Sequence, residues 1–127
     1  MKKLLLLSAF LTFACSSDDS DSSNSNGNSI NPPAWIQGVW INNTSSVFDF
    51  RTDDICLTAG TITSCNKAYM ALSSESSAYE EISDTRYYVV ISFAGVMEST
   101  YEFEKVSDST INWILYPSGT ISTFTKN

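Results

Sequence analysis

Apolar and polar residues alternate along much of the second half of the chain, a pattern typical of β-strands. The clearest stretch covers residues 85–93, where one side carries Thr85, Tyr87, Val89, Ile91 and Phe93. The other side includes Tyr88 and Val90 and is also partly apolar, so we expect a strand in the middle of its sheet.

Shorter alternating stretches predict further strands around this one, and short polar turns separate them. They cover Val39–Asn43, Ser46–Arg51, Asp54–Leu57, Thr61–Ser64, Lys67–Leu72, Met97–Glu104, Ile111–Tyr116 and Ile121–Lys126. The best helical candidate, Ala71–Ile82, is rich in serine and has a weak apolar period. We therefore predict an all-β fold, a small antiparallel up-and-down barrel of about eight strands, because closure hides the edges of a meander. Such a barrel is either filled by its own side chains or holds one small ligand.

The N-terminus has a different pattern. Lys2 and Lys3 precede an almost wholly apolar stretch, Leu4–Ala14, as in the n-region and h-region of a signal peptide. A helix of this length spans only about 17 Å, well short of the hydrocarbon core of a bilayer at about 30 Å. We therefore predict that residues 1–14 are a signal peptide that is removed.

A cysteine follows directly after the small residue at the expected cut. The stretch Leu11-Thr12-Phe13-Ala14-Cys15 resembles a lipobox, and its loose form is similar to that of lipoproteins from the Bacteroidetes. The resemblance implies that Cys15 carries a diacylglycerol with acyl chains such as palmitate, which anchors the mature chain to the outer membrane. Plain secretion with an unmodified Cys15 is the alternative.

Residues 15–33 follow as a Ser/Asn-rich stretch with almost nothing to bury, so we expect a disordered tether ahead of a domain at residues 34–127. The carboxylates of Asp18, Asp19 and Asp21 lie close behind the cysteine and look like the export signal of surface-exposed Bacteroidetes lipoproteins. We expect the cell surface on this basis. The alternative is a solvated spacer on a protein that faces the periplasm.

Charge and composition exclude several functions. Removing residues 1–14 leaves 5 basic and 14 acidic residues, and a chain with a net charge of about −9 and no basic patch is not built for nucleic acid. The sequence contains no histidine, so the common nucleophile–base arrangements and imidazole metal sites are excluded. Neighbouring acids such as Asp53 and Asp54, or Glu80 and Glu81, are more typical of a solvated surface than of a glycosidase pair. We expect no enzyme activity, cofactor or metal.

Cys56 and Cys65 remain once Cys15 is modified, and an even pair in an exported domain is most simply a disulfide. Closing this loop stabilises the fold by about 2.7 kcal/mol in the chain-entropy model. A metal or redox pair is the alternative, but the spacing is long for such a pair and no histidine accompanies it.

A family resemblance begins at the first predicted strand, Trp35-Ile36-Gln37-Gly38-Val39-Trp40. The Gly38-x-Trp40 motif resembles the opening of lipocalins and of lipocalin-like domains in small flavobacterial lipoproteins. The resemblance implies that the Trp40 indole closes the base of a barrel, and that a basic side chain from the last strand, here Lys126, packs on it.

The resemblance and the alternating pattern together predict a non-catalytic binding module. Four inward aromatic residues are the candidate lining for a small apolar or amphipathic ligand: Tyr87, Tyr101, Phe103 and Trp113. Their alternative role is to fill the core. In that case the outer surface, with Tyr88 and Tyr116, would engage a glycan, an envelope or host protein, or act as an inhibitor.

Overall fold

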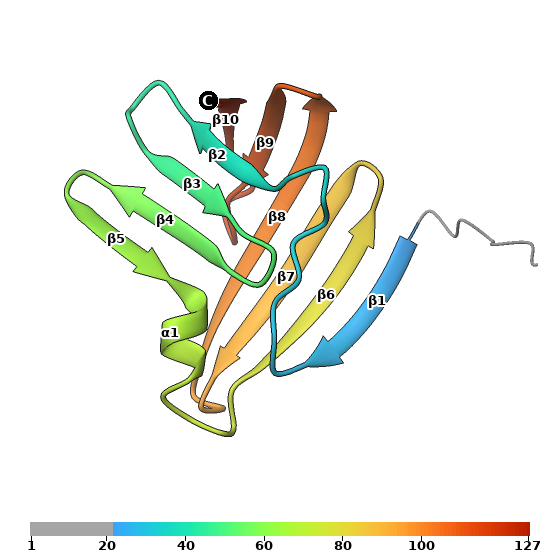
Figure 1. Ribbon diagram of the computed structural model, residues 1–127, viewed down its shortest axis with the longest axis vertical. Helices are drawn as coiled ribbons and strands as arrows, with labels where there is room; N and C mark the ends of the chain where they lie inside the picture. The colour runs from blue at the N-terminus through green and yellow to red at the C-terminus, as the bar shows by residue number, and fades with distance from the viewer. Residues whose placement is uncertain (1–21) are drawn as a thin grey trace, which may run out of the picture.

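The computed structural model describes residues 22–127, which form one antiparallel sheet of ten strands with a single short helix (Figure 1). The elements are β1 (Ser22–Gly27), β2 (Gly38–Ile41), β3 (Val47–Phe50), β4 (Ile55–Ala59), β5 (Ile62–Cys65), α1 (Asn66–Met70), β6 (Ser77–Ser83), β7 (Arg86–Phe93), β8 (Met97–Ser107), β9 (Thr110–Ile114) and β10 (Ile121–Lys126). The predicted signal peptide and the predicted lipidation site Cys15 lie outside the described residues. Within residues 22–127, the helix is too short and too polar to cross a membrane.

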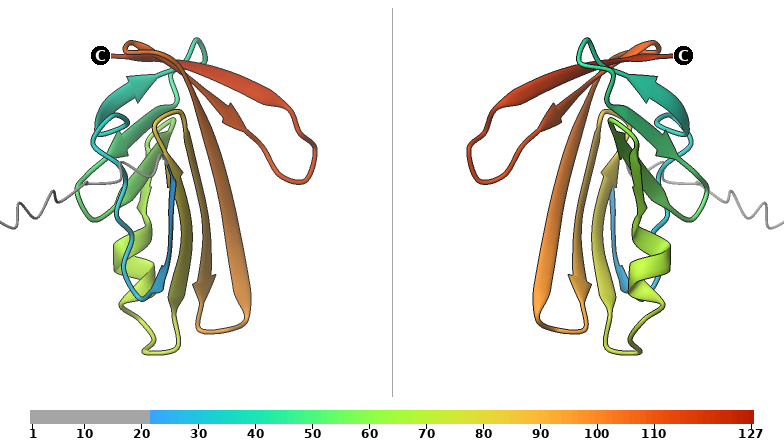
Figure 2. Two further views of the ribbon diagram at one scale, coloured as in Figure 1. Left: turned by 90° about the vertical axis from the view of Figure 1, so that its right-hand side faces the viewer. Right: turned by 90° about the vertical axis from the view of Figure 1, so that its left-hand side faces the viewer.

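The chain builds two meanders, β2 to β5 and β6 to β10, and joins them through its last strand. Thr125 of β10 pairs with Ile41 of β2, and Lys126 pairs with Trp40. Figure 2 shows that the sheet curls strongly, so that the two meanders face each other as a half-barrel. The predicted all-β, antiparallel, up-and-down architecture is confirmed.

The half-barrel is not closed into a cylinder. In the described part of the chain, β5 pairs with β4 alone and β1 with β6 alone, so these two strands are the edges of the sheet. The prediction of a strand at Lys67–Leu72 is wrong, because Asn66–Met70 forms α1 instead. This helix follows β5 directly and lies against β4 and β7, where a strand closing the sheet would have to pass.

The N-terminal boundary of the domain also differs from the prediction. Ser22–Gly27 falls within the predicted tether at residues 15–33, yet it pairs along its whole length with β6. Backbone hydrogen bonds to an open strand edge need no apolar side chain, so the hydrophobic pattern could not indicate this strand. The connection that follows crosses the open side of the half-barrel (Figure 1) and buries Ile30 and Ile36 in the core.

Aromatic rings fill the space between the two meanders. The ring of Phe48 lies 5.0 to 6.3 Å from the ring centroids of five others: Phe50, Tyr101, Phe103, Trp113 and Phe124. Most of these contacts are edge-on or tilted, the arrangement that the quadrupoles of aromatic rings favour. The middle of the half-barrel is therefore a packed core.

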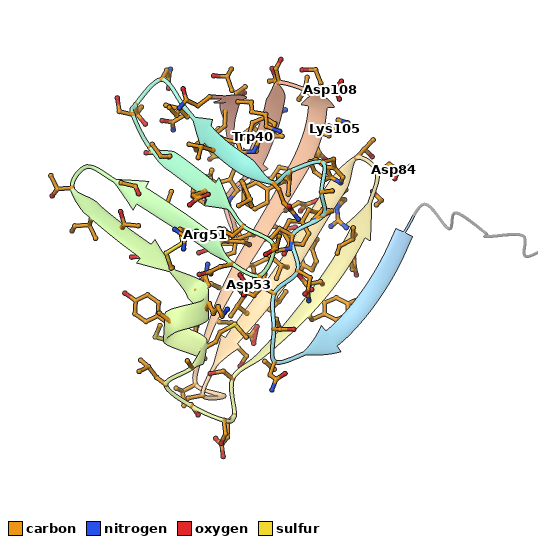
Figure 3. All side chains as sticks on the ribbon, in the orientation of Figure 1. Trp40, Arg51, Asp53, Asp84, Lys105 and Asp108 are labelled. Carbon is orange, nitrogen blue, oxygen red and sulfur yellow. A yellow bond between two sulfur atoms is a disulfide. The ribbon has the colours of Figure 1, made fainter. Side chains whose placement is uncertain are left out.

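One end of the half-barrel is closed by Trp40, whose position Figure 3 shows at the end opposite α1. The indole is fully buried and donates from Nε1 to the carbonyl oxygen of Ile36 at 2.6 Å. The Lys126 Nζ lies 5.3 Å from the ring centroid, so the contact that the resemblance implied is present. Gly38 has φ +121°, and a Cβ there would lie 3.1 Å from Lys126 Cε, which explains why glycine precedes this tryptophan by two positions.

Candidate functional site

A groove of about 420 Å³ opens at the end of the half-barrel opposite Trp40. We call it the mouth groove. Its first wall is α1 with the connection to β6, and its second is the turn between β7 and β8. Ser99 and Tyr101 on β8 form its floor. Its apolar lining residues are Tyr69, Leu72, Phe93, Ala94, Val96, Met97 and Tyr101, and its polar ones are Ser64, Asn66, Ser73, Ser76 and Ser99.

Among residues 22–127, no charged side chain lines the groove. It combines aliphatic and aromatic surface with hydroxyl and amide groups, the usual composition of a site for a small organic molecule. An anionic or cationic ligand group would lose its hydration there without gaining an opposite charge. The groove is therefore suited to an uncharged amphipathic molecule.

The turn wall of the groove has a fixed conformation. Val96 N donates to the Phe93 carbonyl oxygen at 3.1 Å, and the two central residues, Ala94 and Gly95, have φ values of 54° and 71°. These are the features of a type I′ hairpin turn, in which alanine at positive φ is strained. Ala94 N also donates to the Ser76 hydroxyl at 3.2 Å, so a hydrogen bond joins the two walls.

The helical wall is positioned by a buried polar cluster. Asp54 is only 4% exposed, and its Oδ1 accepts hydrogen bonds from Ile55 N at 2.8 Å and from Lys67 N at 2.9 Å in the first turn of α1. Asn66 Nδ2 donates to the Ile55 carbonyl oxygen at 2.8 Å. No side chain adjacent to the helix caps it, so Asp54 supplies the acceptor from the β3–β4 loop.

The predicted disulfide is confirmed and ends directly before this helix. Cys56 and Cys65 are bonded and face each other across β4 and β5. Asp54 lies near both sulfurs, but the sulfurs are spent in the disulfide and do not form a metal site. The bridge therefore fixes the start of α1 to the sheet.

Only one of the four predicted ligand residues lines the mouth groove. Tyr101 lines the mouth groove and is half-buried, and burial raises the pKa of its phenol, partly offset by a hydrogen bond with Asn66. Tyr87 and Phe103 have no exposed surface, so the prediction that they line a ligand site is corrected. Trp113 packs against Phe48 in the core and does not line the groove. The alternating pattern correctly predicts which side chains point inward. It does not show whether an inward side chain lies in the packed core or at the mouth groove.

Tyr87 has a different, structural role. Its hydroxyl donates to Glu80 Oε1 at 2.6 Å, and the same oxygen accepts from Asn31 N at 2.7 Å. Burial, followed by the nearby Glu80, raises the pKa of Tyr87 far above its ordinary value. This buried group anchors the segment between β1 and β2 to the inside of the sheet.

The groove residues on α1 and on the two connections were missed by the sequence analysis. Tyr69 and Leu72 were assigned to a strand, and Val96 had no assignment. A Phe-Ala-Gly-Val segment between two alternating stretches was the available signal, since a glycine in a short connection between two strands indicates a hairpin turn.

A second set of residues forms an ordered cluster on the outer face of β6 to β8 and on the connection that follows β9, and we call it the outer tyrosine cluster. Its members are Tyr79, Glu81, Arg86, Tyr88, Glu102 and Tyr116. Arg86 bridges the two carboxylates at 2.9 Å and 2.7 Å and lies 4.9 Å from the ring centroid of Tyr88. The hydroxyls of Tyr79 and Tyr116 donate to Glu81 and Glu102.

The two carboxylates of this cluster are held in their charged form. Burial acts to raise the pKa of Glu102, but hydrogen bonds from Tyr116 and Arg86 outweigh it and lower the pKa. The Tyr79 and Arg86 hydrogen bonds lower the pKa of Glu81. Tyr116 itself remains 52% exposed, so the cluster presents a fixed aromatic ring to solvent.

In each pair of neighbouring acidic residues named above, the two carboxylates lie in different environments. Asp53, labelled in Figure 3, pairs with Lys67 at the surface, while Asp54 lies buried beside α1. Glu80 is inside the sheet and Glu81 outside it.

Comparisons with protein-family models, with curated proteins and with solved structures give no match for this chain.

Proposed function

We propose that this chain is a lipid-anchored, non-catalytic binding module that holds one small, uncharged amphipathic molecule in its mouth groove. The observation that carries the proposal is the uncharged, largely apolar lining of a groove whose walls are fixed by a type I′ turn and by the Ser76–Ala94 hydrogen bond. A site formed in advance binds without the cost of ordering its walls.

The size of the groove supports a small ligand. A volume of about 420 Å³ falls within the range of small-molecule sites. About 20 non-hydrogen atoms at about 0.3 kcal/mol each give a binding free energy of about −6 kcal/mol, or a Kd of about 40 μM. We therefore expect the groove to bind its ligand with a Kd in the micromolar range.

Several polar groups of the lining lie away from the tips of its two walls, which supports an amphipathic ligand. Asn66 and Ser64 lie where β5 meets α1, and Ser99 and Tyr101 lie on the floor. Leu72 and Val96 lie at the tips of the two walls. We expect the ligand to place a hydroxyl, amide or ester group near Asn66 and its apolar part between the tips.

The anchoring part of the proposal rests on the sequence at Leu11–Cys15. We propose that acyl chains on Cys15 hold the domain at the outer membrane, with the acidic stretch behind it favouring the cell surface. Metabolic labelling with palmitate should mark the chain, and Cys15→Ala should remove the label. Retention of the label in Cys15→Ala would exclude lipidation at this residue, and whole-cell protease shaving tests the membrane face.

The binding proposal is tested by titrating a neutral solvatochromic dye into residues 22–127, which contain the whole described sheet and core. We expect saturable uptake of one dye per chain, also visible in native mass spectrometry. Ser99→Trp fills the groove from its floor and should weaken uptake at least tenfold. Thr100→Trp, on the outer face of the same strand, is the matched control. Equal uptake by both variants, or none by the unmodified domain, would exclude the groove as the site.

A second candidate function is contact with a glycan or an envelope protein through the outer tyrosine cluster. The fixed and exposed ring of Tyr116 beside Tyr88 favours it, because aromatic residues that lose little conformational entropy are common in binding surfaces. A glycan-array signal that is lost in Tyr116→Ala and retained in Ser99→Trp would support this surface. The reverse result would support the groove.

A further inference from the structure

Exposed apolar side chains gather around the mouth groove. Eight large hydrophobic residues of the described chain are exposed, and four of them surround this groove: Tyr69 (51%), Leu72 (82%), Val96 (86%) and Met97 (65%). We call these four the apolar rim. The other four are spread over the rest of the described surface.

The apolar rim projects at the tips of two connections rather than forming a flat patch. Leu72 follows α1 on the way to β6, and Val96 and Met97 follow the β7–β8 turn. Both connections lie at the same end of the molecule in both views (Figures 1 and 2). The type I′ turn and the Ser76–Ala94 hydrogen bond hold them in place, so the exposed side chains are not a result of a loose loop.

The charges near the apolar rim determine which kind of surface can bind there. The four rim residues are uncharged. The charged residues within three positions of them in sequence are Lys67, whose ammonium group pairs with Asp53, and the exposed acidic residues Glu75 and Glu98. The whole chain has a net charge of −7. An anionic surface is therefore repelled, whereas a lipid surface without net charge can receive aliphatic side chains at the boundary between headgroups and acyl chains.

We propose that the apolar rim docks on a lipid surface of no net charge, and that the mouth groove opens onto that surface. A flat protein partner would meet only the tips, because the groove lies between them, whereas fluid lipid fills around projecting side chains. The ligand's route from lipid into the groove rests on the function proposed above, since an uncharged amphipathic molecule partitions into lipid. Docking of the rim does not depend on it.

The test places an environment-sensitive fluorophore on the rim of the chain from residue 15 onward, mixed with phosphatidylcholine vesicles. Single cysteines Leu72→Cys, Val96→Cys and Ile121→Cys in a Cys15→Ala background carry the probe, and a nitroxide-labelled phosphatidylcholine quenches it. Ile121 on β10 is 57% exposed and serves as the matched control away from the groove. We expect quenching at positions 72 and 96 to exceed that at 121 at least threefold. Equal quenching at all three positions overturns the proposal.

A second set of variants tests whether the quenching depends on the apolar rim. Val96→Asp should remove the quenching of a probe at position 72, and Ile121→Asp should leave it unchanged. Quenching that survives Val96→Asp overturns docking by the rim. Ser99→Trp blocks the groove but leaves the rim, so it should weaken dye uptake at least tenfold and retain quenching. This result separates a failure of rim docking from a failure of ligand binding.

Discussion

Asp54 lies inside the protein beside the first turn of α1, and its replacement tests how the helical wall of the mouth groove is held. Asp54→Ala removes the acceptor of two backbone N–H groups, those of Ile55 and Lys67. Ile55 is fully buried, so its N–H is left unsatisfied at a cost of about 2 kcal/mol. Lys67 is exposed, and water can replace its partner at a cost of about 1 kcal/mol.

Asp54→Ala is therefore expected to lower the free energy of unfolding by about 3 kcal/mol. Asp54→Asn keeps an oxygen in the same place and should cost about 1 kcal/mol, since it loses only the charge assistance. Urea unfolding of residues 22–127 followed by tryptophan fluorescence measures both values. Because α1 forms one wall of the groove, dye uptake should weaken in Asp54→Ala and stay near normal in Asp54→Asn.

The neighbouring residue provides the control. Asp53 is an exposed carboxylate that pairs with the Lys67 side chain at the surface, so Asp53→Ala should unfold at the same urea concentration as the unmodified domain within error. If Asp54→Ala and Asp54→Asn unfold at the same urea concentration, the side-chain oxygen does not hold α1 and the explanation given for this wall is wrong.

Three further predictions concern stability. Replacing both Cys56 and Cys65 with alanine should lower the free energy of unfolding by about 2.7 kcal/mol, and an unchanged urea midpoint after reduction would contradict this. The pKa of Glu102 is lower in the folded chain than its ordinary value of 4.5, so its contribution is present above that value and is lost as pH falls below it. Thermal scans from pH 6 to 3 should show a shallower loss of Tm in Glu102→Gln, and parallel curves would refute this assignment. Gly38→Ala should cost about 2 kcal/mol, because its φ of +121° disfavours any Cβ and the new methyl group displaces Lys126; an unchanged Tm would show that the backbone relaxes.

The sequence was sufficient for the central strands. In β7, Tyr87, Val89 and Ile91 are buried while Arg86 and Tyr88 lie on the outer side, as the period-two pattern predicts. In a strand with one face in the core, apolar residues occupy every second position, so the sequence identifies the inward face. The same alternation identifies the inward residues that fill the space between the two meanders. Alternation of apolar and polar residues also predicts the other strands on which the all-β prediction is based.

The elements that the sequence did not reveal depend on partners far along the chain. The acceptor for the first turn of α1 comes from Asp54, 13 residues before Lys67, so no adjacent capping residue marked the helix. The sequence predicts no strand within the weak helical candidate Ala71–Ile82, yet Ser77–Ser83 forms β6, which is paired on both sides by β1 and β7. Pairing on both sides outweighs a weak local preference.

The candidate site was predicted only in part for a similar reason. Tyr101 lies in the groove, but its neighbours in the groove come from α1 and from two turns, whose relative positions follow from the curl of the sheet. Glu102 lies on the outer face of β8, yet hydrogen bonds from Tyr116 and Arg86 cover it and leave it only 8% exposed. Both outcomes depend on contacts between segments that are distant in the sequence.

The pairing of β10 with β2 also sets a condition on when the domain can fold. The two residues that meet there, Ile41 and Thr125, are 84 positions apart, so the two meanders stay separate until almost the last residue is available. Contacts at such separation form slowly. A chain synthesised from its N-terminus would therefore stay open until its end emerges, and loss of β10 would leave β2 and β9 as two additional edges exposed to other chains.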